Sequence, residues 1–206
     1  MFDFHGLILS NFWYPYIVRL FIAVNVPEEF RNKVGEIVQR LSQSARRDKA
    51  EIKWVKPERF HFTLKFLGEC LEEQLPQLTS ALDAAIQGIR PFSIQLGGVS
   101  CFPEHGPLRI IWLGVREGET ELAGLALRVE TACETLGLSK ETRPFSPHLT
   151  LGRVNYFPDY ERFQSRLATI NINEIGSYTV KTVDLIRSVL SSAGPTYTIL
   201  HSAVFQ

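Results

Sequence analysis

The sequence is poor in cysteine and carries no excess of charge of either sign. Three of its 206 residues are cysteines, and its 22 basic side chains are balanced by 22 acidic ones. Cys70, Cys101 and Cys133 form no CxxC pair, so we predict buried thiols in a reducing compartment, the cytoplasm. A neutral chain is not a general nucleic-acid coat, because that role depends on neutralising many phosphates. Recognition of one phosphate group needs only a few local cations and stays open.

The sequence also lacks a run that could cross a membrane or direct secretion. Residues 1–18 are rich in aromatic and apolar side chains, but Asn11 and Pro15 interrupt them and Asp3 lies near the start. The segment has no lysine or arginine near its start and no small-residue cleavage site. We therefore predict an N-terminal appendage at 1–18 and a single domain at 19–206. A start codon assigned too early would explain the same segment.

Several motifs of nucleotide-binding and hydrolytic proteins are absent. The sequence has no GxGxxG or GxxxxGK[ST] phosphate loop, and Gly97 and Gly98 lie between strand-like residues, as in a bulge. It has neither the GxSxG elbow of serine hydrolases nor the HExxH pattern of zinc enzymes. These absences count against a doubly wound parallel sheet, which is the competing fold. No metal or other cofactor is predicted.

Hydrophobic patterning predicts the order strand, helix, strand, helix, strand, twice over. The first unit runs from about Arg19 to Gly98 and the second from about Arg109 to Ile186. The expected strands are 19–26, 59–68, 91–102, 108–115, 144–154, 178–190 and 196–205, and the expected helices are 27–45, 75–86, 122–136 and 158–170. This repeat predicts an α+β fold with two pseudo-equivalent lobes, each a small sheet with helices packed on one face.

Two nearly identical words, HFTL and HLTL, begin at His61 and His148 in corresponding strands of the two units. Alternate residues of a strand share a face, so His61 points the same way as Thr63, and His148 the same way as Thr150. The apolar residues between them face the opposite way, toward the helices. If the lobes are related by a pseudo-two-fold axis, the two polar faces can meet across one cleft.

Two imidazoles and two hydroxyls around one point can hydrolyse a phosphodiester without a metal. A neutral imidazole removes a proton from water, and a protonated one gives a proton to the leaving oxygen. Threonine hydroxyls donate hydrogen bonds to the phosphate oxygens, where charge accumulates. A strained cyclic diester suits such a site best, because its leaving oxygen stays tethered. Two histidines alone are an incomplete set of zinc ligands. The other three histidines, His5, His105 and His201, are expected to have surface or structural roles.

The paired words lie within the longer segments WVKPERFHFTLKFLGE and RPFSPHLTLGRV. Together these segments resemble the signature of the 2H phosphoesterases, and most closely the RNA 2′,3′-cyclic phosphodiesterases, also called 2′-5′ RNA ligases. The resemblance covers about Arg19 to Phe205. It implies a bilobal α+β fold with antiparallel sheets lining a central cleft. It also implies metal-independent opening of RNA 2′,3′-cyclic phosphates to 2′-phosphomonoesters, and joining or cleavage of 2′-5′ linkages, as in RNA processing.

The resemblance assigns roles to residues of both words. His61 and His148 become the acid–base pair, with His61 as the base and His148 as the acid, and the two threonines become phosphate clamps. Arg153 would add charge to the phosphate, although strict alternation puts it on the face opposite His148, so a bulge or twist after Leu151 is required. Phe66 occupies the matching place after the first word, where it could stack on a base or be a core aromatic.

The sequence leaves the substrate class and the activity partly open. The cleft could bind a nucleotide or an RNA end without turning it over, or it could act on another small cyclic phosphate from ADP-ribose or oligoadenylate metabolism. A nucleic-acid chain would bind through basic residues such as Lys53, Lys56, Lys65 and Arg109. We predict a monomer with no membrane association and no obligate protein partner.

Overall fold

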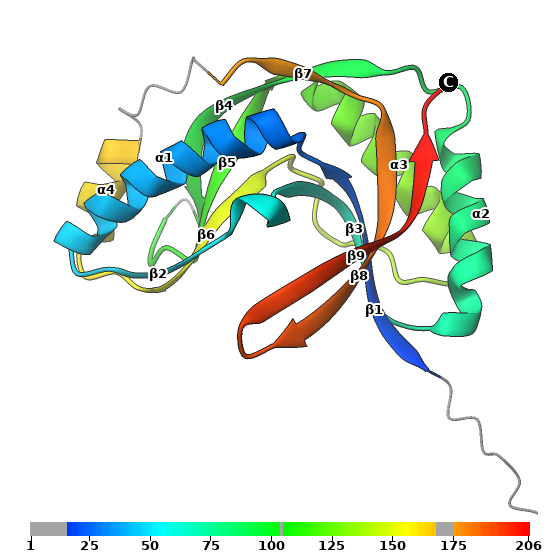
Figure 1. The fold of residues 1–206 in the computed structure, drawn as a ribbon, viewed down its shortest axis with the longest axis horizontal. Helices are drawn as coiled ribbons and strands as arrows, with labels where there is room; N and C mark the ends of the chain where they lie inside the picture. The colour runs from blue at the N-terminus through cyan, green and yellow to red at the C-terminus, as the bar shows by residue number, and fades with distance from the viewer. Residues whose placement is uncertain (1–15, 104, 168–174) are drawn as a thin grey trace, which may run out of the picture.

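The computed structural model describes residues 16–103, 105–167 and 175–206, which form a curled antiparallel sheet with helices packed on it (Figure 1). The elements, in chain order, are β1 (Ile17–Asn25), α1 (Glu28–Arg47), β2 (Glu51–Trp54), η1 (Pro57–Arg59), β3 (His61–Leu71), η2 (Glu72–Gln74), α2 (Leu75–Ile86), β4 (Phe92–Phe102), β5 (Ile110–Glu117), α3 (Glu119–Thr135), β6 (Leu149–Tyr156), α4 (Tyr160–Leu167), β7 (Ser177–Val180), β8 (Thr182–Ser191) and β9 (Gly194–Val204).

The strand order β7-β4-β5-β6-β3-β1-β8-β9 divides the sheet into two lobes, and β2 pairs with β6 off this path. Lobe one holds β3, β1, β8 and β9, and lobe two holds β2 and β4 to β7. A single antiparallel pair, Phe62 with Leu149, joins β3 to β6 and thereby joins the lobes. Every pairing among the described strands is antiparallel, which confirms the bilobal α+β prediction and rules out the parallel sheet.

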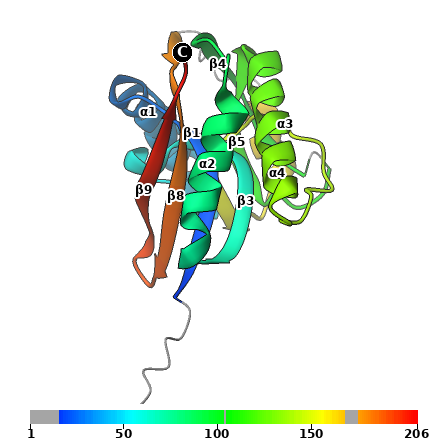
Figure 2. The same ribbon diagram turned by 90° about the vertical axis from the view of Figure 1, so that its right-hand side faces the viewer.

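The two lobes do not correspond to the two sequence units. Strand β4 ends the first unit but pairs in lobe two, whereas β8 and β9 at the end of the chain complete lobe one. Helix α1 follows β1 yet contacts β2 of lobe two (Figure 1), and α4 contacts β4 of the same lobe. Helices α2 and α3 pack against each other, with α2 against β9 and α3 against β3 of lobe one (Figure 2). The units therefore exchange strands and helices, which binds the lobes into one body.

The helices form where apolar residues recur at helical spacing. In α1, Phe30, Val34, Ile37 and Leu41 are buried. Its first turn carries Glu28 and Glu29 and its last turn carries Arg46 and Arg47, so the charges at both ends complement the helix dipole. Within the described ranges, no helix combines the length and the apolar character that crossing a membrane requires.

Several boundaries differ from expectation. The strand expected at 178–190 is divided at Lys181 into β7, which pairs with β4, and β8, which pairs with β1. Strand β2 lies between the first expected helix and the second expected strand, where no element was predicted. Strand β1 begins at Ile17, two residues earlier than expected, and most of the predicted appendage lies outside the described residues. The three cysteines are buried, as predicted.

Candidate active site

The two words meet where the two lobes join. Phe62 pairs with Leu149, and in an antiparallel register this puts His61 level with Thr150 and Thr63 level with His148. The side chains of Phe62 and Leu149 are buried in the core, whereas the histidines and threonines on the opposite face are half-buried. The expected side-by-side arrangement of the two half-sites therefore results from one cross-strand pair.

Each imidazole is anchored in the same way. Nδ1 of His61 lies 2.7 Å from the carbonyl oxygen of Arg59, and Nδ1 of His148 lies 2.8 Å from that of Ser146. A carbonyl oxygen only accepts hydrogen bonds, so both Nδ1 atoms carry the proton. Nε2 of each ring is left without a protein partner in the described structure and is available for proton transfer.

The two histidines differ in their electrostatic surroundings. Burial lowers the pKa of His61 below the usual histidine value, the hydrogen bond to the Arg59 carbonyl opposes this, and the positive charges of His148 and Arg153 lower the pKa further. His61 is therefore neutral near pH 7, the form in which an imidazole can accept a proton. The two sequence words do not distinguish the rings, whereas the surroundings of His61 favour its role as the base.

Aromatic rings that the sequence analysis did not single out flank both histidines. The His61 ring lies 4.9 Å from Phe21 and 5.4 Å from Tyr197, between centroids. The His148 ring lies 5.3 Å from Phe102 and 6.4 Å from Trp112. Phe21 has the same parity in β1 as Asn25, which pairs directly with His61, so its ring lies on the face of that histidine.

The bulge that Arg153 requires is present in β6. Trp112 pairs with Thr150 and Ile111 pairs with Gly152, so Leu151 has no partner in β5. Leu151 and Gly152 are consecutively buried, and alternation resumes with Arg153 exposed on the face of His148. The effect of Arg153 on the pKa of His61 places its charge within electrostatic reach of the site.

Strand β3 has a bulge at the corresponding place. Ala23 pairs with Thr63 and Ile22 pairs with Lys65, which leaves Leu64 without a partner in β1. Phe66 then returns to the face of His61 and is 64% exposed. Of its two expected roles, the core aromatic is ruled out, and the ring is accessible for stacking.

One of the basic residues expected to contact a nucleic-acid chain is not available. Lys65 is only 5% exposed, and its Nζ donates to Oε1 of Glu130 at 2.7 Å and to the carbonyl oxygen of Ser139 at 2.9 Å. The prediction for Lys65 was therefore wrong, because the bulge turns this side chain into the body of lobe one. Lys53, Lys56 and Arg109 are exposed, and Lys53 pairs in register with Arg153.

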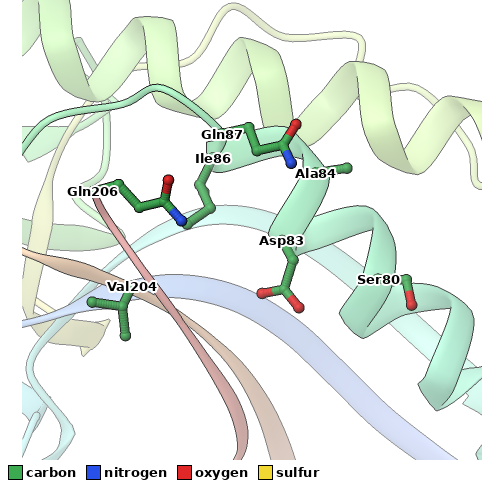
Figure 3. Close-up of a pocket in the computed structure, with 7 residues that line it drawn as sticks. All are labelled: Ser80, Asp83, Ala84, Ile86, Gln87, Val204 and Gln206. Atoms are coloured by element: carbon green, nitrogen blue, oxygen red, sulfur yellow. The ribbon is translucent and has the colours of Figure 1, made fainter.

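A hollow of about 420 Å³ lies away from the histidines, between α2 and the end of β9 (Figure 3). Ser80, Asp83 and Gln87 of the α2 region face Val204 and Gln206 across it (Figure 3). Its lining offers no acid–base pair. Nε2 of the nearby His201 lies 2.7 Å from Oδ1 of Asp83, and this contact fits the structural role expected for His201. Among the described residues, no cluster of histidine, cysteine and acidic side chains has a metal-site arrangement.

Two interleaved lobes that each bring one HxTx word to their junction define the class of 2H phosphoesterases. The sequence model of the LigT-like phosphoesterases matches this chain twice, at residues 24–112 and 113–197. The protein therefore belongs to the LigT-like phosphoesterase family.

Curated relatives and solved structures agree with the family assignment. The RNA 2′,3′-cyclic phosphodiesterase of Methanothermobacter thermautotrophicus is 35% identical over 88% of this chain and 95% of that protein, and the one of Archaeoglobus fulgidus is 36% identical over 87% and 96%. TT0787 of Thermus thermophilus superposes with a TM-score of 0.72 at 29% identity, covering 91% of this chain and 97% of that one. E. coli LigT complexed with 3′-AMP has the same fold, with a TM-score of 0.73 at 24% identity over 93% of this chain and 99% of that one.

Proposed function

We propose that the protein hydrolyses RNA or nucleoside 2′,3′-cyclic phosphates to 2′-phosphomonoesters without a metal ion. The observation that supports this proposal best is the pairing of Phe62 with Leu149, since it aligns His61 with Thr150 and Thr63 with His148, and both imidazoles are anchored through Nδ1 to a backbone carbonyl. The names of the curated relatives support the same substrate class.

In the proposed reaction His61 is the base and His148 is the acid. Neutral His61 takes a proton from water at Nε2 while the water oxygen forms a bond to phosphorus. The bond from phosphorus to O3′ breaks, and protonated His148 gives its Nε2 proton to O3′. The products are a 2′-phosphate and a free 3′-hydroxyl, and proton exchange with solvent restores both rings. With an RNA 5′-hydroxyl in place of water, the same step forms a 2′-5′ linkage reversibly.

The threonines and the arginine stabilise the charge that develops on phosphorus. Thr63 and Thr150 stand beside the opposite histidine in register, where their hydroxyls can donate to the non-bridging oxygens. Arg153 adds a fixed positive charge on the same face, and exposed Phe66 offers its ring to the nucleobase.

The test is turnover of adenosine 2′,3′-cyclic phosphate in the presence of a chelator, with the product identified by phosphorus NMR. We expect adenosine 2′-phosphate as the product and a loss of about 10²–10⁴-fold in kcat for both His61→Ala and His148→Ala. His201→Ala, whose ring lies at Asp83 away from the site, is the matched control. Wild-type turnover in both site variants would overturn the mechanism, and binding without turnover would point to a binding module.

We also propose that residues 19–206 act as one domain, as a monomer in the cytoplasm. The support for one domain is the exchange of strands between the sequence units, because neither unit could complete a lobe alone. Mass spectrometry of the native N-terminus tests the boundary of the appendage, and analytical ultracentrifugation tests the oligomeric state.

A further inference from the structure

Three arginines from different elements lie near His61. They are Arg19 of β1, Arg59 of η1 and Arg153 of β6. Burial raises the pKa of the Tyr197 hydroxyl, and the positive charges of all three arginines oppose that shift. The three guanidinium groups therefore lie within electrostatic reach of one hydroxyl, on a ring whose centroid is 5.4 Å from that of His61.

The strand registers also place Arg19 near Tyr197, without reference to its effect on the pKa of the Tyr197 hydroxyl. Leu20 pairs with Arg187, so Arg19 is level with Ser188, and Ser188 pairs with Tyr197. Arg19 also has the parity of Phe21, whose ring lies 5.1 Å from that of Tyr197. Arg19 thus lies on the face of lobe one that carries His61 and Tyr197, in the same cross-strand row as Tyr197.

The side chain of Arg59 reaches the same strand from the other direction. Its Nη1 lies 2.9 Å from the position that a Cβ atom on Gly194 would occupy, so the guanidinium rests against the start of β9. Its carbonyl oxygen meanwhile holds Nδ1 of His61. Arg59 therefore spans from the imidazole that we assign as the base to the strand that carries Tyr197.

These charges are not neutralised by the protein. Across 16–103, 105–167 and 175–206, none of the three arginines forms an ion pair, although Glu69 is level with Arg19 in register. Asp184, a buried carboxylate in the strand next to β1, instead accepts hydrogen bonds from Asn25 and Ser202, both at 2.6 Å. A surface with several unpaired cations attracts an anion. The reacting phosphate accounts for Arg153, which leaves Arg19 and Arg59.

We propose that Arg19 and Arg59 bind a second phosphate, attached to the 5′ oxygen of the nucleoside whose cyclic phosphate lies between the histidines. This rests on the proposed function. A nucleoside 2′,3′-cyclic phosphate has only its 5′-hydroxyl left to carry another phosphate, so the chemistry fixes the attachment point. The phosphate belongs either to the preceding nucleotide of an RNA chain or to a 5′-phosphorylated mononucleotide.

Kinetics with three substrates test the proposal: adenosine 2′,3′-cyclic phosphate, its 5′-phosphorylated form, and the dinucleotide that ends in the same cyclic phosphate. We expect the wild-type kcat/KM to favour the two compounds with a second phosphate. Arg19→Gln and Arg59→Gln should each reduce that preference about tenfold, because each removes a charge-assisted hydrogen bond. Arg40→Gln, on the exposed side of α1, is the matched control and should keep the wild-type preference.

Comparing the two substrates that carry a second phosphate identifies the source of that phosphate. A gain for both compounds assigns the subsite to any 5′-phosphate, and a gain for the dinucleotide alone assigns it to an RNA chain. A preference that survives both arginine substitutions, or no wild-type preference at all, overturns the proposal.

Binding of products separates this proposal from the proposed function. Calorimetry should show that adenosine 2′,5′-bisphosphate binds more tightly than adenosine 2′-phosphate, by a margin that shrinks in Arg19→Gln and as salt rises. If no cyclic phosphate is turned over but this margin exists and depends on Arg19, the subsite stands and the hydrolase proposal falls. Equal affinities for the two products overturn the subsite even if hydrolysis proceeds.

Discussion

The His61 and His148 half-sites share their geometry but differ in their surroundings. In both, Nδ1 bonds to the carbonyl two residues earlier, two aromatic rings flank the imidazole, and a bulge follows the HxTx word. Burial lowers the pKa of His61, while the residue after the bulge is Phe66 on one side and Arg153 on the other. The repeated residues thus set the position of the groups, and the unrepeated ones set what each group does.

The second residue of each bulge, Lys65 in β3 and Gly152 in β6, also differs between the two half-sites. Lys65 is turned inward and joins the strand of the first word to Glu130 and Ser139, in the segment that leads to the second word. Gly152 is packed so closely against β2 that a Cβ atom would lie 2.9 Å from both Ile52 Cγ2 and Trp54 Cε3. One bulge is therefore stabilised by a buried ion pair and the other by close packing.

The largest expected effect comes from breaking the ion pair of the first bulge. Lys65→Met should destabilise the protein by about 3 kcal/mol, because it removes the only cation paired with the Glu130 carboxylate in the described structure, which then keeps just the backbone N–H of Glu141, in a site where the Lys65 and Glu130 side chains are 3% and 14% exposed. The double variant Lys65→Met with Glu130→Leu should recover most of this loss, since a buried ion pair can be replaced by apolar groups. Urea denaturation measures both, and an unchanged midpoint in the single variant would contradict the comparison.

The next effect concerns the residue that follows the second bulge. Arg153→Gln should lower kcat about 10²-fold, because it removes a positive charge from the side of the site where phosphate charge develops. Arg153→Lys keeps the charge but not the forked donors, so it should recover only part of the rate. Steady-state kinetics with a nucleoside 2′,3′-cyclic phosphate distinguish these results. A full rate in Arg153→Gln would mean that the charge does not act on the phosphate.

Local patterns predicted the faces of the strands but not which strands pair. Alternation correctly put His61 and His148 on the face opposite the buried Phe62 and Leu149. The exchange of β4 and β8 between the units was missed, because strand pairing is set by contacts between residues far apart in the sequence. Repeats that follow one another along the chain do not reveal that their strands interleave.

The residues that the sequence analysis missed are explained by their local surroundings. Phe21 lies in 19–26, a nearly continuous apolar run, because β1 is buried on both faces and so shows no alternation. The bulge before Arg153 was anticipated, because strict alternation would otherwise put this side chain on the face opposite His148. The bulge before Phe66 was not, although a lysine next to Leu64 in a buried strand was a visible interruption of the pattern.

Replacing Phe66, the residue that follows the bulge in β3, by a smaller side chain tests whether its ring binds the substrate. Phe66→Ala should raise KM for a nucleoside 2′,3′-cyclic phosphate about tenfold with little change in kcat, because stacking contributes to substrate binding. Phe66→Leu should give an intermediate KM, since it keeps apolar contact without an aromatic face. The ring is 64% exposed, so stability should change little in a thermal melt. A drop in kcat without a change in KM would assign the ring to the chemical step instead.

The smallest expected effect is a shift in pH dependence that tests the electrostatic difference between the half-sites. The base must be neutral, so kcat/KM should rise as pH increases through the pKa of His61, which lies below the usual histidine value. Arg153 and His148 both lower that pKa. The acid limb of the kcat/KM profile should therefore move to higher pH in Arg153→Gln, and only slightly in Arg153→Lys, which keeps the charge. NMR titration of the His61 ring in His148→Asn gives the same information without turnover. There the pKa should rise, because a positive neighbour is gone, and a fall would show that the two imidazoles are not coupled as the geometry requires.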